Sequence, residues 1–376
     1  MKVLILSCST GEGHNSAGNA VSEYFKASGI QCDIVNAFNF VSQPLSEFLS
    51  KGHVFVYRNM PRLFGVGYKI EEKYPPKSFY RKMAKGAPAL AKYIRIGEYD
   101  AVICSHIFAA MMLTECRHNF GCGAPAYLIA TDYTCSPGAN MLDMDAYFIP
   151  HEKLAAEFAD KGIPSERIVP SGIPVSQKFF SAKPKAQSRK ELGLPADSSI
   201  ILLSSGSMGC GPMGELTQKL LDKADYGTKI CVICGNNKKL YDELLPLCRD
   251  SRLVLEGFTL KMYDYMNSAD VYITKAGGLS STEAVALGVP LVFVAAVPGC
   301  ESYNISFLTS NNCAVTADSA DKITELALDI VKNRTAYSEK FYKGQKSIAG
   351  NGAKNIYDYV INDSYGRKNA EKTEEK

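Results

Sequence analysis

The sequence predicts an α/β protein made of two Rossmann-like domains, each built on a parallel sheet. Three observations support this prediction. Short runs of β-branched and aliphatic residues alternate with helical patterns, the alternation pauses in a polar, proline-containing segment at residues 171–199, and it starts again at residue 200. A chain of 376 residues is also long enough for two domains. Because ligands bind beyond the carboxyl ends of parallel strands, we expect the two domains to face a central cleft that holds the site.

Each expected strand is a short run of β-branched or aliphatic residues. In the first half these runs cover residues 3–7, 101–105, 126–131 and 146–150. In the second half they cover residues 200–206, 229–235, 253–258, 271–278 and 290–294, with an amphipathic helical stretch at residues 212–223. We therefore divide the chain into an amino-terminal domain at residues 1–175, a carboxyl-terminal domain at residues 176–365 and a charged tail at residues 366–376 that we expect to be disordered.

Composition excludes several classes of protein. With 46% hydrophobic residues and a formal net charge of +3, the chain is not intrinsically disordered. Its twelve cysteines show no repeated ligand spacing, which indicates neither a disulfide framework nor a zinc cluster and fits a reducing cytosol. The start has too short an apolar run for a secretory signal, and the apolar stretch at residues 289–297 is far below the roughly 20 residues that span a bilayer. We expect a cytoplasmic protein whose membrane contact, if any, is peripheral.

The first chemically informative segment is SCSTGEGHNSAG at residues 7–18, which turns a strand into a helix opening near Asn15 and Ser16. Gly11 and Gly13 allow close backbone approach, and the free N–H groups at the start of a helix favour a bound anion or hydroxyl. The segment lacks the third glycine of a dinucleotide-binding fingerprint and the G-K-[ST] of a P-loop. We expect a loop that binds an acceptor or an anion.

His14 lies within this turn, where a neutral imidazole could take a proton from a substrate hydroxyl. The local sequence is equally compatible with a histidine that caps the helix or packs inside the domain. Both interpretations stay open at this point.

The second segment, at residues 273–290, ends a strand at Thr274 and then opens a helix. It forms a cradle for a diphosphate from Gly277, Gly278, Ser280, Ser281 and Thr282. Glu283 follows in what we expect to be the first helical turn, where a carboxylate could accept two hydrogen bonds from a ribose. The alternative is that Glu283 is a capping-box residue.

A third segment, at residues 297–308, places Glu301 and Asn304 after a strand and a Pro-Gly turn. These side chains would bind sugar hydroxyls, unless the segment is a solvated turn that opens a helix. The first strand of the second domain also ends in a glycine-rich loop, at residues 204–214, in which Gly206 is a candidate donor-binding residue.

A basic segment lies at residues 51–95, which contain eleven Lys or Arg residues against Glu71 and Glu72. Aromatic and aliphatic residues are interleaved with the charges, so the segment could dock on an anionic lipid surface, although a solvated basic face is the alternative. Because no nucleic-acid-binding signature accompanies it and the overall charge is slight, we exclude a nucleic-acid partner.

These segments together resemble a glycosyltransferase family, the one that contains plant monogalactosyldiacylglycerol synthases and bacterial processive diacylglycerol glucosyltransferases. The resemblance runs from residue 1 to about residue 350. It rests on TGEGHNSAG at 10, ATDYTCSP at 130, SGIPVSQKF at 171, ICGNNKKL at 233, GFTLKMYDYM at 257, TKAGGLSSTEAVALGVP at 274 and PGCESYN at 298. The chain departs from the family pattern at Cys135, Ser136 and Pro137 and in reading KAGG and PGCE, which bears on the choice of sugar and acceptor.

The resemblance implies a GT-B fold and an inverting, metal-independent transfer of glucose or galactose from a UDP-sugar to diacylglycerol at the inner face of the cell membrane. It implies no metal and no cofactor, and the DMD sequence at residue 143 lies outside the expected nucleotide domain. It also assigns roles: His14 is the candidate base, Asp132 its alternative or its orienting acid, Glu283 the ribose ligand, Phe258 the edge of the uracil pocket, and Glu301 and Asn304 the sugar ligands.

Three alternatives remain open. The acceptor could be another lipid such as a polyprenyl carrier, the enzyme could be a UDP-N-acetylglucosamine epimerase of similar fold, or the chain could be a non-catalytic nucleotide-sugar sensor. A dehydrogenase is disfavoured because neither glycine loop has dinucleotide-binding spacing. The oligomeric state is not predicted.

Overall fold

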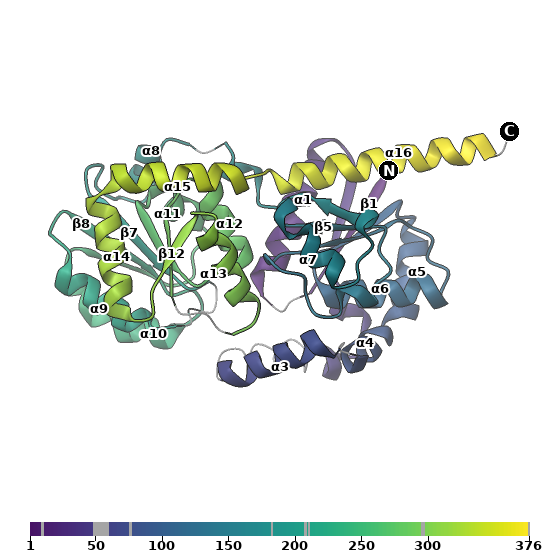
Figure 1. Cartoon of the computed structure of the whole chain (residues 1–376), viewed down its shortest axis with the longest axis horizontal. Helices are drawn as coiled ribbons and strands as arrows, with labels where there is room; N and C mark the ends of the chain where they lie inside the picture. Colours follow the sequence, from purple (N-terminus) through teal and green to yellow (C-terminus); the bar gives the residue numbers. More distant parts are fainter. Residues whose placement is uncertain are drawn as a thin grey trace. The chain divides into compact units, whose positions relative to one another are not determined.

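The computed structural model consists of two compact units (Figure 1). It describes residues 1–8, 11–47, 60–74, 77–181, 183–206, 209, 211–294 and 298–374, without the side chains of residues 61–62 and 368–374. Unit 1 comprises Met1–Gln177, Pro298–Cys300 and Gly350–Lys376. Unit 2 comprises Lys178–Val297 and Glu301–Ala349.

Unit 1 contains a parallel sheet of six strands in the order β2-β1-β3-β4-β5-β6. The strands are β1 (Lys2–Ser7), β2 (Gln31–Asn36), β3 (Ala101–Cys104), β4 (Ala126–Ile129), β5 (Ala146–Ile149) and β6 (Ile168–Pro170). Its helices are α1 (Glu12–Ala27), α3 (Pro61–Lys73), α4 (Lys77–Ala84), α5 (Ala87–Gly97), α6 (Ile107–Asn119), α7 (Ala155–Asp160) and α16 (Gly352–Glu374).

Unit 2 repeats this plan with the order β12-β11-β10-β7-β8-β9, again all parallel. The strands are β7 (Ser199–Ser204), β8 (Thr228–Ile233), β9 (Leu253–Glu256), β10 (Val271–Thr274), β11 (Leu291–Phe293) and β12 (Ala314–Thr316). The helices are α8 (Lys185–Glu191), α9 (Met213–Lys223), α10 (Lys238–Leu244), α11 (Met262–Ser268), α12 (Gly278–Ala286), α13 (Cys300–Ser310), α14 (Ala320–Lys332) and α15 (Arg334–Ile348).

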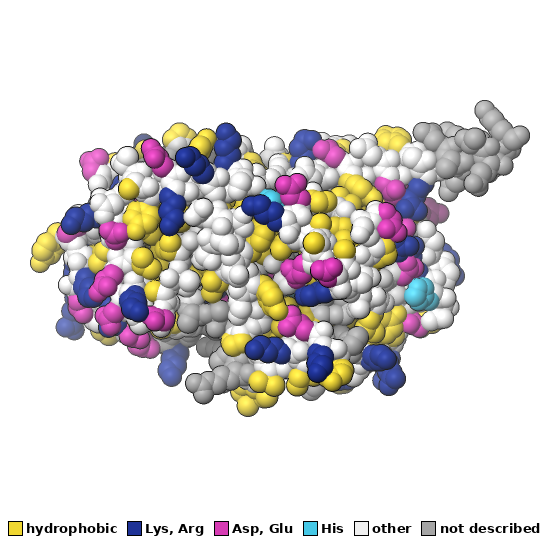
Figure 2. Space-filling model, viewed as in Figure 1, with side chains coloured by type: hydrophobic (Ala, Val, Ile, Leu, Met, Phe, Trp, Pro, Cys, Tyr) yellow, Lys and Arg dark blue, Asp and Glu magenta, His cyan; other side chains and the backbone are white. Residues whose placement is uncertain are grey.

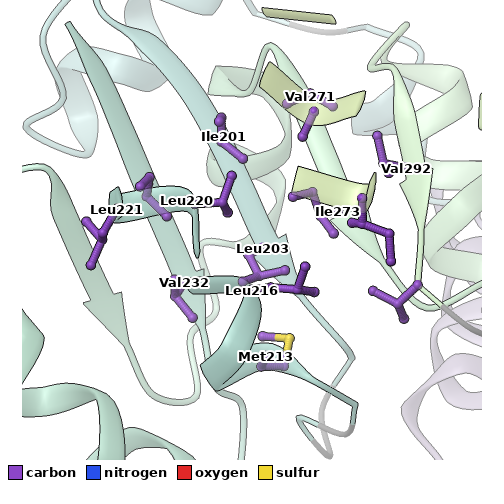
Figure 3. Packing of buried hydrophobic residues seen from close by; sticks show 14 of the residues in the cluster. Ile201, Leu203, Met213, Leu216, Leu220, Leu221, Val232, Val271, Ile273 and Val292 are labelled. Carbon is purple, nitrogen blue, oxygen red and sulfur yellow. The ribbon is translucent and has the colours of Figure 1, made fainter. Parts of the chain in front are cut away.

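The central strands form because their apolar runs are covered on both faces, as in other parallel sheets with crossover helices. Figure 3 shows this packing in unit 2, where Ile201 and Leu203 of β7 meet Leu216 and Leu220 of α9. Ile273 of β10 belongs to the same cluster and is fully buried. In β8, Cys231 is buried as a free thiol, and Cys234 just beyond the strand is a buried free thiol as well, so both side chains pack in the interior of unit 2.

Each sheet reverses its strand order at one place. In unit 1 the chain passes from β2 across β1 to β3, and in unit 2 it passes from β9 across β7 to β10. Ligands of open α/β sheets bind beyond the carboxyl ends of the strands at such a reversal. The loops after β1 and β3, and those after β7 and β10, are therefore where each unit's chemistry is expected.

The end of the chain differs from the sequence-based prediction. We predicted that the second domain extends to residue 365 and that residues 366–376 are disordered, whereas α16 belongs to unit 1 and continues to Glu374. Ala353, Ile356 and Val360 of this helix are fully buried in the core of unit 1. Arg367 forms ion pairs with Asp363 and Asp145, and these contacts hold the helix beyond residue 365.

Candidate functional site

His14 lies in the first turn of α1, beyond the carboxyl end of β1. The sequence predicted that this helix opens near Asn15, whereas it begins at Glu12. The imidazole Nδ1 is 2.8 Å from the carbonyl oxygen of Ser105 and 3.2 Å from Oγ1 of Thr131. Ser105 follows β3 and Thr131 follows β4. The side chain thus joins the ends of three neighbouring strands at the reversal point of unit 1.

These contacts determine which ring nitrogen of His14 can act as a base. The Ser105 carbonyl can only accept, so Nδ1 carries the proton and donates it, and Nε2 keeps its lone pair. Burial lowers the pKa of His14, while the nearby Asp132 carboxylate and the Ser105 hydrogen bond raise it in part. The net lowering favours a neutral imidazole at neutral pH, which is the form that accepts a proton.

Within unit 1, the charge of the Asp132 carboxylate raises the pKa of His14. The structure therefore brings this predicted pair of residues near each other. It also adds His106, to which the sequence analysis assigned no role. The rings of His14 and His106 meet edge to face with centroids 4.3 Å apart, and His106 is buried at the start of α6 with Nδ1 accepting the N–H of Phe108. Its position directly after the apolar run at residues 101–105 was the signal that could have identified it.

The other predicted residues of this loop have different surroundings. A side chain at Gly11 would meet open space, which fits a backbone that a ligand approaches. Asn15 accepts a hydrogen bond of 2.7 Å from the Ser7 hydroxyl and so ties α1 to the end of β1. Gly13 and Ser16 are both partly exposed in α1. Gly13 lies in the first turn, where N–H groups lack helical partners, whereas Ser16 lies beyond that turn.

The second group of predicted residues surrounds the start of α12, at the reversal point of unit 2. This helix begins at Gly278, and its N-cap residue, Gly277, has no side chain with which to cap it. The N–H groups of Gly278, Leu279 and Ser280 therefore lack partners inside the helix, which makes this terminus suited to an anion. The sequence analysis had the helix open later, among the hydroxyl residues.

The three hydroxyl residues do not contribute equally to this terminus. Thr282 donates to the Gly278 carbonyl at 2.7 Å and Ser280 to the Gly277 carbonyl at 3.4 Å, so these bonds lie within the turn. The Ser281 hydroxyl is fully buried and has no hydrogen-bond partner among the described residues. Backbone amides, more than hydroxyls, are thus the groups that this terminus offers.

Glu283 is the sixth residue of α12, which excludes the capping-box alternative because that role belongs to the third residue, here Ser280. No described residue forms a hydrogen bond with its carboxylate. Burial raises the pKa of Glu283 to about 7, and the nearby Lys178 ammonium lowers it in part. A partly buried carboxylate without a hydrogen-bond partner fits a site that accepts bonds from a ligand's hydroxyls.

Glu301 and Asn304 lie in α13, and their burial shows that the segment is not a solvated turn. Glu301 is 3% exposed, and its Oε1 is 2.9 Å from Nζ of Lys275. Asn304 is fully buried and donates to the carbonyl of Ala276 at 2.8 Å. Both side chains thus brace the loop between β10 and α12.

Gly206 and Phe258 complete the predicted donor residues. Gly206 has a φ of +69° after β7, and a Cβ there would lie 3.5 Å from Cε of Lys275, so the loops after β7 and β10 are neighbours. Phe258 follows β9 and is 59% exposed, which leaves its ring available to a flat ligand. Every donor residue named from the sequence is in unit 2 and every acceptor residue is in unit 1. The cleft between the domains stays a prediction.

The basic segment predicted at residues 51–95 is described from residue 60 onwards, except for residues 75–76; residues 51–59 lie outside the described part. On α3 and its two flanking residues, exposed apolar side chains follow helical spacing and form one face, which we call the α3 apolar face. Its members are Met60, Leu63, Val66, Ile70 and Tyr74, all between 46% and 62% exposed.

The opposite side of α3 is tethered, because Glu72 lies 3.8 Å from Nζ of Lys161 in unit 1. Figure 2 shows hydrophobic and basic side chains side by side along the lower edge, where Figure 1 places α3 and α4. Basic residues on these helices include Lys69, Lys73, Lys77, Arg81 and Lys82.

Within the described residues, no three or more His, Cys, Asp or Glu side chains gather as metal ligands would. None of the helices in this described part combines the length and the hydropathy needed to cross a membrane.

Two family models match the chain, one in each half. Residues 14–175 match the model described as monogalactosyldiacylglycerol (MGDG) synthase. Residues 200–359 match the model described as the glycosyltransferase family 28 C-terminal domain. The first match begins at His14 and the second contains all of the candidate donor residues.

A curated relative of similar sequence is the processive diacylglycerol beta-glucosyltransferase of Bacillus mycoides, which is 27% identical over 323 residues, 84% of this chain and 81% of the relative. Among solved structures, MurG of Acinetobacter baumannii matches with a TM-score of 0.64 and 17% identity over 96% of this chain and 99% of that one. The UDP-GlcNAc 2-epimerase of Neisseria meningitidis bound to UDP-GlcNAc matches with a TM-score of 0.63 and 14% identity, over 96% and 100%. The structural matches confirm the GT-B fold of two Rossmann-like domains.

Proposed function

Since this chain belongs to the UDP-sugar glycosyltransferases of the monogalactosyldiacylglycerol synthase and diacylglycerol glucosyltransferase family, we propose that it transfers glucose or galactose from a UDP-sugar to diacylglycerol. The transfer inverts the anomeric carbon, needs no metal ion and takes place at the inner face of the cell membrane. The observation that carries the proposal is the His14 imidazole, whose Nδ1–H is committed to Ser105 and whose Nε2 is left as a base.

In this reaction His14 takes the proton of the acceptor hydroxyl at Nε2 as the oxygen attacks the anomeric carbon of the donor. A base that is already neutral, and held in one tautomer by a backbone carbonyl, needs no rearrangement before it accepts the proton. Asp132 stabilises the imidazolium that forms, because its charge already raises the pKa of the ring. His106 packs against one side of the ring and limits its rotation.

The leaving UDP is stabilised in unit 2 without a metal ion. The uncapped amides at the start of α12 point their partial positive charge at the diphosphate. Glu283 accepts the ribose hydroxyls, Phe258 borders the uracil, and Glu301 and Asn304 hold the loop against which the donor sugar lies. The loop with Gly206 completes this site.

The lipid acceptor is favoured by the α3 apolar face, which exposes large hydrophobic side chains beside lysines and arginines. Such a face enters the boundary between headgroups and acyl chains, and the cations attract anionic lipid. An epimerase or a nucleotide-sugar sensor would not need a membrane-binding face such as the α3 apolar face. A polyprenyl acceptor would use the same face. The test below distinguishes the two acceptors, because each liposome preparation contains only one of them.

The test is an assay on anionic liposomes that contain either diacylglycerol or a polyprenyl phosphate, with UDP-glucose or UDP-galactose as donor and with or without a metal chelator. We expect mass spectrometry to find a glycosylated diacylglycerol in which the anomeric configuration is inverted, formed equally with the chelator present. Strict dependence on a metal ion contradicts the proposed stabilisation of UDP, and transfer only to the polyprenyl lipid contradicts the proposed acceptor.

The His14→Ala substitution tests the base in the same assay. We expect kcat to fall by about 10²-fold to 10⁴-fold, the usual contribution of a general base, while UDP-glucose still binds because its ligands are in unit 2. The matched control is His118→Ala, which removes an exposed histidine of the same unit. Transfer at the wild-type rate by His14→Ala would assign the base to another residue.

A further inference from the structure

The segment at residues 130–138, which follows β4 and which we call the β4 loop, contacts the candidate base directly. Its first residue, Ala130, donates its N–H to a carbonyl oxygen of β5 at 2.9 Å, which fixes the start of the loop to the sheet. The next residue, Thr131, places its Oγ1 3.2 Å from Nδ1 of His14, and Asp132 follows it in the chain. The surroundings of the imidazole therefore depend on where this loop lies.

The β4 loop has a second anchor, the Glu157 carboxylate of α7. Its Oε1 accepts the Thr134 hydroxyl at 2.6 Å and the Cys135 N–H at 3.0 Å. Both donors belong to buried residues, since Thr134 is 0% and Cys135 1% exposed. Hydrogen bonds to an ionised carboxylate are stronger than those between neutral groups. One carboxylate oxygen thus holds both a side chain and the backbone of the loop.

Lys161 of the same region completes this anchor. Its Nζ lies 3.2 Å from Oε1 of Glu157 and donates to the Cys135 carbonyl at 3.0 Å. The N–H and the carbonyl of Cys135 are therefore both bound by side chains from this one region. The helix that carries Glu157 is itself fixed by Phe158, which is 2% exposed. The anchor thus rests on a packed element.

Only residues 131–133 separate the two anchored points of the β4 loop. Tyr133, the last of them, is buried. Each residue has only two soft backbone dihedrals, so fixing both ends of such a short span leaves Thr131 and Asp132 few orientations. A loss of the second anchor would therefore move these two residues relative to His14.

We propose that Glu157 is a positioning residue for the candidate base. It fixes the β4 loop so that Thr131 and Asp132 keep the His14 imidazole in the orientation that takes the proton of the acceptor. This inference rests on the proposed function, because it requires His14 to act as a base. Glu157 acts through the loop and does not touch the reacting atoms. Since a misplacement of about 1 Å by a distant change can cost about 100-fold in rate, such an anchor is important for turnover.

Two substitutions of Glu157 test the proposal. Glu157→Met has a side chain of similar length that is a much weaker acceptor, whereas Glu157→Gln keeps a carbonyl oxygen for both hydrogen bonds. In the liposome assay with saturating diacylglycerol, kcat of Glu157→Met should fall by about 10-fold to 100-fold. Glu157→Gln should keep at least about a third of the wild-type kcat, because its hydrogen bonds are weakened and not lost. Calorimetry should find the same UDP-glucose affinity in both variants and the wild type, because the donor residues are in unit 2.

The matched control is Asp358→Met. It also removes a carboxylate that pairs with a lysine four positions away in the chain, here Lys354 at 2.6 Å on a partly exposed part of unit 1, and should change neither kcat nor UDP-glucose affinity. A wild-type kcat in Glu157→Met, even with a lowered melting temperature, overturns the positioning role. So does an equal loss of kcat in both Glu157 variants, or a loss of UDP-glucose affinity that parallels the loss of kcat. A wild type that transfers no sugar from either donor overturns the proposed function itself.

Discussion

Single side chains in this protein have chemical properties that their sequence neighbours do not reveal. Glu283 follows two serines and a threonine, so its sequence is compatible with a capping box. The structure excludes the capping box, because α12 begins at Gly278, two residues before the first of these hydroxyl residues. His106 was missed for a related reason, because its contact with His14 joins two segments that are far apart in the chain.

The raised pKa of Glu283 predicts a pH dependence of donor binding. Ribose hydroxyls donate to the ionised carboxylate, and with a pKa of about 7 the group is mostly protonated at pH 6 and mostly ionised at pH 8. UDP-glucose should therefore bind roughly tenfold more weakly at pH 6 than at pH 8. UDP-glucose is the right probe because both of its phosphates are esterified and do not titrate in this range. Calorimetry at the two pH values measures the ratio.

Two variants assign the effect to this carboxylate. Glu283→Gln should bind weakly at both pH values, with a ratio close to one. Lys178→Met removes the ammonium that lowers the pKa of Glu283, so the midpoint should move to higher pH. A tenfold ratio that persists in Glu283→Gln would place the titrating group elsewhere.

Among the elements, α3 is the one whose sequence pattern and surroundings disagree most with an ordinary surface helix. Its apolar residues recur with helical spacing, yet they point away from the tethered side and remain about half exposed. The interleaving of basic and apolar residues in the sequence predicts that this segment is a candidate membrane surface. The sequence could not say which apolar residues are exposed, because burial depends on what α3 packs against.

The α3 apolar face predicts a specific loss of membrane binding. Replacing Val66 and Ile70 with Asp places two charges where the face enters the lipid, so binding to anionic liposomes should weaken by at least about tenfold, the equivalent of roughly 1.5 kcal/mol of lost apolar burial. Co-sedimentation measures it. UDP-glucose binding should not change.

Leu245→Asp is the control, since Leu245 is 50% exposed against 55% for Ile70 but belongs to unit 2. If this control lowers liposome binding as much as the α3 substitutions do, general surface charge is responsible. If neither the variant with Asp at Val66 and Ile70 nor Leu245→Asp loses liposome binding, the membrane contact lies outside α3.

In the molecule as a whole, the sequence predicted both sheets but not all of their edges. The central strands were identifiable because burial on two faces requires continuous apolar runs. Three edge strands, β2, β6 and β12, are not among the predicted runs. The strands β6 and β12 have three residues each and are only partly buried, and only one of the six residues of β2 is buried. The same reasoning explains the error at the carboxyl end, where α16 has a weakly amphipathic sequence although Ile356 and Val360 are buried.

Because α16 packs in the core of unit 1, we predict that the stabilities of the two units depend on different parts of the chain. Ile356 is fully buried against the core of unit 1, so Ile356→Ala should lower the stability of that unit by about 2–5 kcal/mol through lost burial and a cavity. Ile330→Ala in α14 makes the same change in the core of unit 2. Hydrogen exchange followed by mass spectrometry reports each unit separately, even where a single melting curve would not. Ile356→Ala should accelerate hydrogen exchange in β1 and β3 and leave exchange in β7 and β10 unchanged. Ile330→Ala should accelerate exchange in β7 and β10 and leave β1 and β3 unchanged. Equal acceleration of all four strands by both variants would mean that the chain unfolds as one cooperative body.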